Sequence, residues 1–465
     1  MNFLIPFLSI FPLVYFASFF YSIKQILSKQ HDGILFFFIF GLPIYITTLS
    51  VLTLYGLGDL IPIVQYTKEI IVMMTLGLLM YELKEYPSLT SLDKIVLIYF
   101  IYNLIYIVIP LGGYSIFEKA IAFKNIAFFP FIYFIGRIIK PETIWLSKYK
   151  ILICILAIAT GSILLFEIAT YTHLQTITGY ADYNFRFLGI EPTGNNGLTW
   201  TFEIEGGIKR FASFFANPLE HAAATLLTIS VLIALLSKKD SENRKIILLA
   251  VLAALISVVF ALSRASLAGF LLVLYLYAIV TKRKNILLVF HIVMAAILIT
   301  ILYFLTDQTL SEFIINTFNF SNSSSLSHLV EWVDGIESIT ANPLGIGLGE
   351  SGRIAGELGL NTGGENQLII LGVQTGIISI ILYLTMLIIS IRWSVKLFTR
   401  TTGKSKQLGI LLFVFKVGMI IPMLTASIES YLYISYMGWF LTGLLSSIYQ
   451  QLIIKKDYDV SRKYN

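Results

Sequence analysis

Residues 366–391 read NQLIILGVQTGIISIILYLTMLIISI, a run that contains no charged side chain. An apolar stretch of roughly 18 residues or more can cross the hydrocarbon core of a bilayer as a helix. Similar runs recur along the whole chain of 465 residues, of which 57% are hydrophobic and 13% are charged. A soluble domain carries roughly 25% charged residues. The sequence therefore predicts an all-α polytopic membrane protein, with residues 1–465 forming a single integral membrane domain.

We expect thirteen membrane spans, within a range of 12 to 14, because each apolar run is one candidate helix. The N-terminal stretch MNFLIPFLSIFPLVYF has no basic leader, so it is interpreted as a retained first span rather than a signal peptide. The expected spans are 3–23, 34–54, 61–81, 93–110, 120–138, 150–171, 217–236, 246–263, 265–281, 286–306, 366–391, 408–428 and 431–453.

The basic residues predict which loops face the cytoplasm. Most of the 33 Lys and Arg residues fall in alternate loops and in the C-terminal tail. Cytoplasmic loops of membrane proteins are enriched in Lys and Arg. The two long connections, 172–216 and 307–365, then lie on the opposite, external side. Within the second connection, apolar residues at helical spacing predict an amphipathic helix over 328–340, resting on the membrane or on the bundle.

Several classes of function receive no support from the sequence. The single cysteine, Cys154, lies in an apolar run, and the five histidines form no HxxxH or HExxH pair, so we expect no metal site. The net charge of +6 reports membrane orientation, and no nucleic-acid partner is expected. Charges inside the spans are few and do not form the serial acidic relay of a proton-driven pump.

Two arginines stand at the expected external boundary. Arg210 opens the stretch RFASFFANP at 210–218, and Arg264 lies in FALSRASLAGF between two spans that have almost no loop between them. A cation at this depth costs free energy on insertion, so it needs a partner. Each arginine is either an anchor at the lipid headgroups or a ligand for an anion. Asn217, Pro218 and Glu220 are instead typical of a capped helix start.

Glu365 and His328 lie on the same external side. Glu365 follows Gly363 and Gly364 and stands at the start of the span at 366–391. An acid there is either a partner of the helix dipole or a functional carboxylate. His328 lies on the stripe of the amphipathic helix that carries Trp332, where it is either a packing residue or a catalyst.

Together these residues suggest a chemistry. Two guanidinium groups bind phosphoryl oxygens bidentately and so suit a pyrophosphate. A carboxylate suits a general base that removes a proton from a hydroxyl. We therefore expect Arg210 and Arg264 to bind a pyrophosphate and Glu365 to be the catalytic base.

Four motifs resemble those of the O-antigen ligase and polymerase family: RFASFFANP at 210–218, LSRAS at 262–266, HLVEW followed by NPLGIGLG within 328–349, and ENQLIILGVQTGI at 365–377. The resemblance implies a GT-C-like membrane glycosyltransferase of the bacterial inner membrane, with its active site facing the periplasm. It implies undecaprenyl-pyrophosphate-linked glycans as donor and acceptor, inversion at the donor anomeric carbon, no cofactor and no required metal. It also leaves room for a chain-length regulator as a partner.

Within this family, ligases typically carry histidine where this chain has Glu365, so the resemblance favours a polymerase of O-antigen or related surface polysaccharide, as in lipopolysaccharide biosynthesis. The alternatives are a ligase that transfers polymer to lipid A core and, in another class, a glycan-lipid transporter. Other members often carry arginine near the position of His328. The secondary substrate-binding candidates are His328, Trp332, His221, Asn366 and Arg353.

Overall fold

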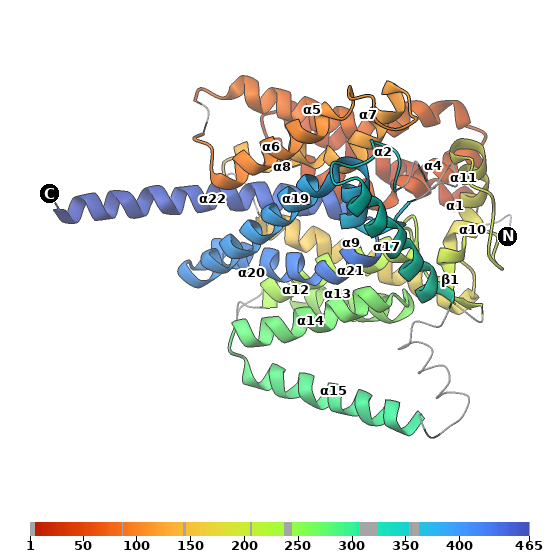
Figure 1. Cartoon of the computed structure of the whole chain (residues 1–465). Coiled ribbons are helices and arrows are strands. Elements are labelled where there is room, and N and C mark those ends of the chain that lie inside the picture. The colour runs from red at the N-terminus through yellow and green to blue at the C-terminus, as the bar shows by residue number, and fades with distance from the viewer. Residues whose placement is uncertain are drawn as a thin grey trace.

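The computed structural model describes residues 5–85, 87–142, 146–204, 207–236, 244–304, 306, 323–352, 355 and 362–464. The described chain is a bundle of helices with one two-stranded hairpin (Figure 1). The helices are α1 Ile5–Leu8, α2 Ile10–Leu27, α3 Ile34–Phe40, α4 Tyr45–Leu54, α5 Ile61–Glu82, α6 Ser91–Ile105, α7 Ile116–Ala127, α8 Phe129–Ile138, α9 Leu146–Thr170, α10 Leu174–Thr178, α11 Tyr180–Leu188, α12 Pro218–Leu236, α13 Arg244–Phe260, α14 Arg264–Val280, α15 Lys284–Phe304, α17 Ser323–Ala341, α19 Gln367–Arg400, α20 Gly403–Gly418, α21 Ile420–Thr425 and α22 Leu432–Tyr464.

Eight of the helical segments in the described residues are long and apolar enough to cross a membrane, and α7 with α8, bent by 45°, makes a possible ninth. This bears out a helical membrane protein. The thirteen expected spans all overlap helices, but α6, α13, α14 and α22 do not meet the same length and hydropathy criteria. The figure of 12 to 14 spans therefore stays a prediction.

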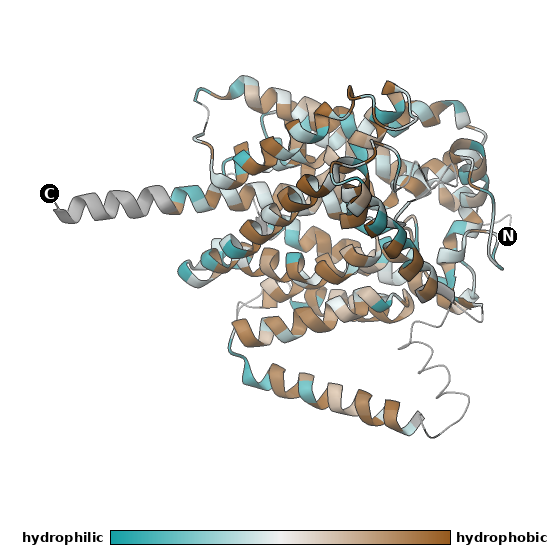
Figure 2. Ribbon diagram, viewed as in Figure 1, coloured by the Kyte–Doolittle hydropathy of each residue, from teal (hydrophilic) through white to brown (hydrophobic). Residues whose placement is uncertain are grey.

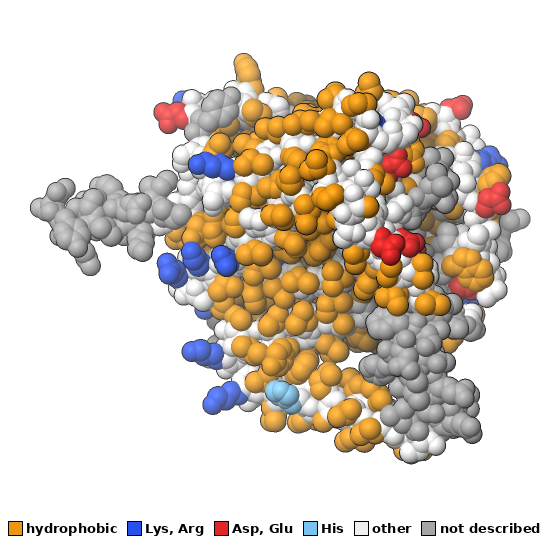
Figure 3. Space-filling view, in the orientation of Figure 1, with side chains coloured by type: hydrophobic (Ala, Val, Ile, Leu, Met, Phe, Trp, Pro, Cys, Tyr) orange, Lys and Arg blue, Asp and Glu red, His pale blue; other side chains and the backbone are white. Residues whose placement is uncertain are grey.

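The two ends of the bundle differ in charge. The C-terminal end of α22 projects from one end, while α10, α11 and β1 (Glu203–Ile204) lie at the other (Figure 1). Apolar residues cover the flanks of the helices between these ends (Figure 2). On the face drawn in Figure 3, Lys and Arg gather at the end where α22 projects, and most of the Asp and Glu side chains lie towards the other. This polarity is the one that the loop charges predict.

One cation departs from its expected place. Arg137 is one of the basic residues that the charge pattern assigns to the cytoplasmic loops, but it lies buried in α8, where its Nε is 3.0 Å from the carboxylate of Asp93 in α6. The same carboxylate accepts hydrogen bonds from Tyr133 and Ser446, so one buried ion pair joins α6, α8 and α22. A charge in a low-dielectric interior needs such a partner, which apolar periodicity alone cannot reveal.

The NPLGIGLG turn at 342–349 forms hydrogen bonds to the backbone beside a break in α19. Gly376 has φ 82° and interrupts the helix, which frees backbone groups around it. Ile346 N donates to Val373 O (2.8 Å) and Gly347 N donates to Gln374 O (3.1 Å). A Cβ atom on Gly345 would lie 2.6 Å from Gln374 O, so only glycine permits this approach. The glycines of this turn therefore let two stretches of backbone approach each other closely.

The amphipathic helix exists as α17, which begins at Ser323, before the expected start at residue 328. Its outer face carries a stripe of exposed apolar side chains, Leu326, Leu329, Val330, Val333 and Ile336. His328 and Trp332 are only partly exposed, and Gly335 is buried against α19. His328, Trp332 and Ile336 follow one another at four-residue spacing along α17, and Ile336 is the most exposed of the three. The β1–β2 hairpin (β2 is Ile208–Lys209) was not expected at all.

Candidate functional site

The loop that carries Arg210 is fastened to the end of α13. Arg210 N donates to Phe202 O (2.9 Å), Phe211 N donates to Phe260 O (3.2 Å), and the Arg210 guanidinium donates through Nε to Ala261 O (3.4 Å). The chain then turns and begins α14 at Arg264. Two residues that are far apart in sequence are thus brought together by a few backbone hydrogen bonds.

Arg264 occupies an electrostatically unfavourable place. It is the first residue of α14, where the helix dipole is positive, and it is exposed. Ser263 caps the helix by accepting from Ser266 N (3.3 Å), so the local sequence ensures that α14 begins here. A helix N-terminus that also presents a guanidinium is suited to an anion.

Glu365 stands on a turn whose shape requires glycine. Gly363 and Gly364 have φ 84° and 62°, in the left-handed region that side chains with a Cβ atom avoid. The next residue, Asn366, caps α19 by accepting from Leu368 N (2.9 Å) and Ile369 N (3.3 Å). Glu365 is therefore held directly outside a capped helix, and its side chain is exposed.

Helix α17 packs on this turn through glycine. A Cβ atom on Gly335 would collide with Ile369 and would lie 2.8 Å from the Cα atom of Gly363. A Cβ atom on Gly364 would collide with the carboxylate of Glu331. His328, one turn away on α17, has Nδ1 3.4 Å from Glu331 Oε2. Helix α17 consequently places the Glu331 carboxylate, and with it the His328 imidazole, next to the turn that carries Glu365.

Electrostatic interactions join the three predicted principal residues into one group. Burial lowers the pKa of Arg210; among its smaller influences, Arg264 lowers it further and Glu365 raises it. Burial raises the pKa of Glu365, while His328 and Arg210 lower it and Glu331 raises it. The side chain of Glu365 keeps some solvent-accessible surface, but the protein around it reduces the hydration of the carboxylate. None of Arg210, Arg264 and Glu365 has a salt-bridge partner within 4.0 Å among the described residues.

Tyr431 belongs to the same group and was missed. Burial, then the charges of Glu365 and Glu220, raise the pKa of Tyr431, and Arg210 opposes them. The phenol therefore stays neutral and can act as a hydrogen-bond donor. Tyr431 follows the 3-10 helix η5 (Ile428–Ser430) in the connection before α22. The chain contains 26 tyrosines, and nothing in the sequence distinguishes this one.

The secondary candidates occupy varied places. His221 is fully buried behind the loop, with Nδ1 3.1 Å from Phe211 O and its ring stacked on Phe215, which does not fit a substrate contact. Asn366 is committed to the helix cap described above. Trp332 is partly exposed on α17. Arg353 lies outside the described residues.

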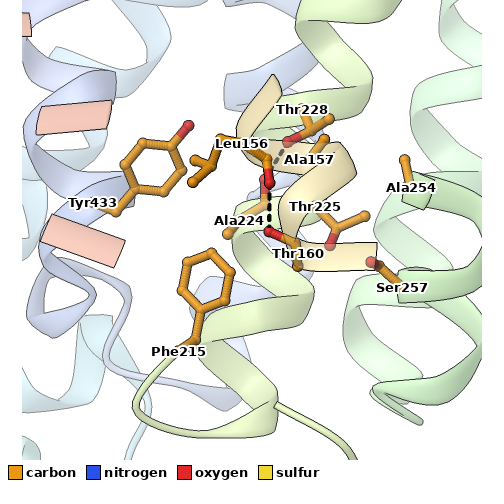
Figure 4. Close-up of a pocket in the computed structure, with 10 residues that line it drawn as sticks. All are labelled: Leu156, Ala157, Thr160, Phe215, Ala224, Thr225, Thr228, Ala254, Ser257 and Tyr433. Carbon is orange, nitrogen blue, oxygen red and sulfur yellow. Dashed lines mark hydrogen bonds between the residues drawn. The ribbon is translucent and has the colours of Figure 1, made fainter. Parts of the chain in front are cut away.

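Neither of two cavities formed by the described part of the bundle is lined by Arg210, Arg264 or Glu365. Figure 4 shows the first, enclosed by α9, α12, α13 and α22, where Thr160 and Thr228 donate their hydroxyl hydrogens to carbonyls of their own helices. The second contains Lys416 and Glu429. The candidate site is therefore the accessible surface around Glu365 rather than either cavity.

Comparison with known proteins does not assign the chain. No protein-family model matches the sequence, and no curated protein is significantly similar to it. Within the described residues, no group of three or more His, Cys, Asp or Glu side chains could hold a metal ion. The arrangement can bind an anion through two guanidinium groups and can accept a proton at a neighbouring carboxylate.

Proposed function

We propose that the protein is a membrane glycosyltransferase that polymerises polyprenyl-pyrophosphate-linked oligosaccharide repeat units. The observation that carries the proposal is the pair Arg210 and Arg264. Neither has a salt-bridge partner among the described residues, and both Arg264 and Glu365 act electrostatically on Arg210. Two neighbouring cations repel each other, and a diphosphate that binds both relieves this repulsion. Such an anion is the leaving group of a lipid-linked sugar donor.

The proposed reaction is a single displacement. Glu365 removes the proton from a sugar hydroxyl of the acceptor as the oxygen attacks the anomeric carbon of the donor. A new C–O bond forms, the bond from that carbon to the pyrophosphate breaks, and the anomeric centre inverts. Arg210 and Arg264 stabilise the negative charge that develops on the departing polyprenyl pyrophosphate. The proton leaves from Glu365 to solvent.

The cellular setting is part of the proposal. A GT-C-like bundle of 12 to 14 spans in the bacterial inner membrane would place the acidic end of the molecule, with connections 172–216 and 307–365, in the periplasm. Lipid-linked repeat units of O-antigen or a related surface polysaccharide are presented there. The concentration of Lys and Arg at the other end supports this orientation (Figure 3).

Two alternatives make different predictions. A ligase to lipid A core would use the same groups with a different acceptor, and transfer of polymer to purified core would favour it. A glycan-lipid transporter needs a polar path through the bundle. Among the described residues, Arg210, Arg264 and Glu365 have no salt-bridge partner and instead form one electrostatically linked group, which favours an enzyme.

The test is a cell-free reaction with purified protein and defined lipid-linked repeat units. The wild-type protein should produce a ladder of polymers. Glu365→Gln should reduce the rate by roughly 10²- to 10⁴-fold, the usual contribution of a general base, while the protein folds and inserts normally. Glu337→Gln, an exposed acid elsewhere on α17, is the matched control and should retain full activity.

A further inference from the structure

Glu331 occupies a position that packing alone does not explain. Its Oε2 is buried and makes no hydrogen bond to any described residue, yet it faces Gly364, the glycine directly before Glu365. Its only ion pair among the described residues is with His328 Nδ1, at 3.4 Å on the same face of α17. A buried carboxylate oxygen is costly unless a charge compensates it.

The surroundings of His328 explain what that carboxylate does. The groups that act on the imidazole are Glu331 on its own helix, Glu365 on the turn before α19, and Arg264 at the start of α14. The pKa of His328 is raised: the side-chain contact with Glu331 is the largest cause, Glu365 adds to it, and burial and Arg264 oppose it. The imidazole therefore keeps its proton to a higher pH than an ordinary histidine, although Arg264 by itself would disfavour the charge.

We propose that Glu331 is a positioning residue, which anchors His328 as an imidazolium next to Arg264 and so gives the anion site a third, titratable positive charge. The inference rests on the function proposed above and deepens it, because it assigns the diphosphate of the donor three cationic contacts. This placement of Glu331 requires glycine at position 364, since a side chain there would displace the Glu331 carboxylate.

The consequence is a pH-dependent affinity for diphosphate. Since the charge on His328 exists only below its pKa, binding should be strongest in mildly acidic solution and should weaken as the pH rises through that value. Arg210 and Arg264 stay charged throughout, so a residual, pH-independent affinity remains.

Binding of inorganic pyrophosphate to the purified full-length protein, measured by calorimetry between about pH 6 and pH 9, tests the proposal. The wild-type affinity should fall by about tenfold over this range, the effect of losing one charge-assisted hydrogen bond. Glu331→Gln should bind weakly at both ends of the range, and Glu337→Gln should behave as the wild type. In the Glu331→Gln background, His328→Lys should restore tight binding, because lysine keeps its charge without the carboxylate.

The outcomes separate this inference from the proposed function. Equal binding by wild type and Glu331→Gln at every pH, with binding still weakened by Arg210→Ala, would overturn the role of Glu331 and leave the arginine site standing. Failure of His328→Lys to restore binding would show that Glu331 acts only through packing on Gly364. Absence of pyrophosphate binding in an actively polymerising wild-type protein would overturn the inference without touching the enzymatic activity.

Discussion

The Nε atom of Arg210 lies 3.4 Å from the carbonyl oxygen of Ala261, three residues before Arg264. This contact places the Arg210 guanidinium at the tight turn between α13 and α14, directly before the helix that Arg264 begins. Leu262 has φ 47°, an unusual left-handed conformation for a leucine, so the turn is constrained as well as short. The pairing of the arginines therefore depends on backbone geometry and not on a shared acidic partner.

Replacement of either arginine by lysine should lower polymerisation by roughly 10- to 100-fold, even though the charge is retained. Lysine cannot form the two parallel hydrogen bonds that a guanidinium makes with phosphoryl oxygens. Initial rates in the cell-free reaction measure the effect. Arg186→Lys is the control, since Arg186 is exposed and paired with Asp182 at 2.8 Å. Full activity in both Arg210→Lys and Arg264→Lys would contradict a bidentate role.

The rate should depend on pH in a bell-shaped manner. Glu365 acts as a base only when deprotonated, and its pKa is raised mainly by burial, so the acidic limb should lie above the ~4.3 of an ordinary glutamate. His328 contributes charge only when protonated, and its pKa is also raised, so activity should decline above the ~6.5 of an ordinary histidine. A pH profile of initial rates checks both limbs. An acidic limb at or below the ordinary glutamate value would argue against Glu365 as the base.

Asp93→Asn should destabilise the bundle by about 3–5 kcal/mol, because it leaves the buried Arg137 charge without its partner. Replacing both residues, Asp93→Leu with Arg137→Met, should recover most of this loss. Thermal unfolding in detergent measures the change, with Asp59→Asn as the control at an exposed aspartate. Equal melting temperatures for Asp93→Asn and Asp59→Asn would show that the ion pair contributes little.

Gly345→Ala should impair both stability and activity. The alanine Cβ atom would meet Gln374 O at 2.6 Å and Gly376 N at 2.7 Å, which would separate the 342–349 turn from the break in α19. Gly56→Ala separates this effect from backbone strain, since Gly56 also has positive φ (74°) but open space around it. Melting temperature and polymerisation rate are the measurements. Matching losses in the two variants would mean that strain alone accounts for the effect.

The sequence predicted most of the helical framework, because uninterrupted apolar runs determine which segments can be buried in lipid. It also singled out Arg210, Arg264 and Glu365 as candidates, since charges next to such runs are costly and therefore conspicuous. The structure adds the approach of Arg210 to the turn before Arg264, which arises from the Phe211 to Phe260 hydrogen bond and could not be read from residues so distant in the chain.

Other features left no local signal. Glu331 and Tyr431 are ordinary residues of a helix and a connection until tertiary packing brings them to Glu365. Arg137 appeared to be one of several loop cations because its partner, Asp93, lies on another helix. His221 lies close to the 210–218 motif in sequence and so became a candidate. Its burial behind Phe211 depends on how the loop folds over α12, which the sequence does not show.

The most direct measurement is a cryo-electron microscopy structure of the Glu365→Gln variant with an undecaprenyl-pyrophosphate-linked repeat unit bound. The account predicts that the diphosphate lies within hydrogen-bond reach of both Arg210 and Arg264, with the anomeric carbon of the sugar turned towards residue 365. A diphosphate bound at the Lys- and Arg-rich end of the bundle, or held without contact to either arginine, would contradict it.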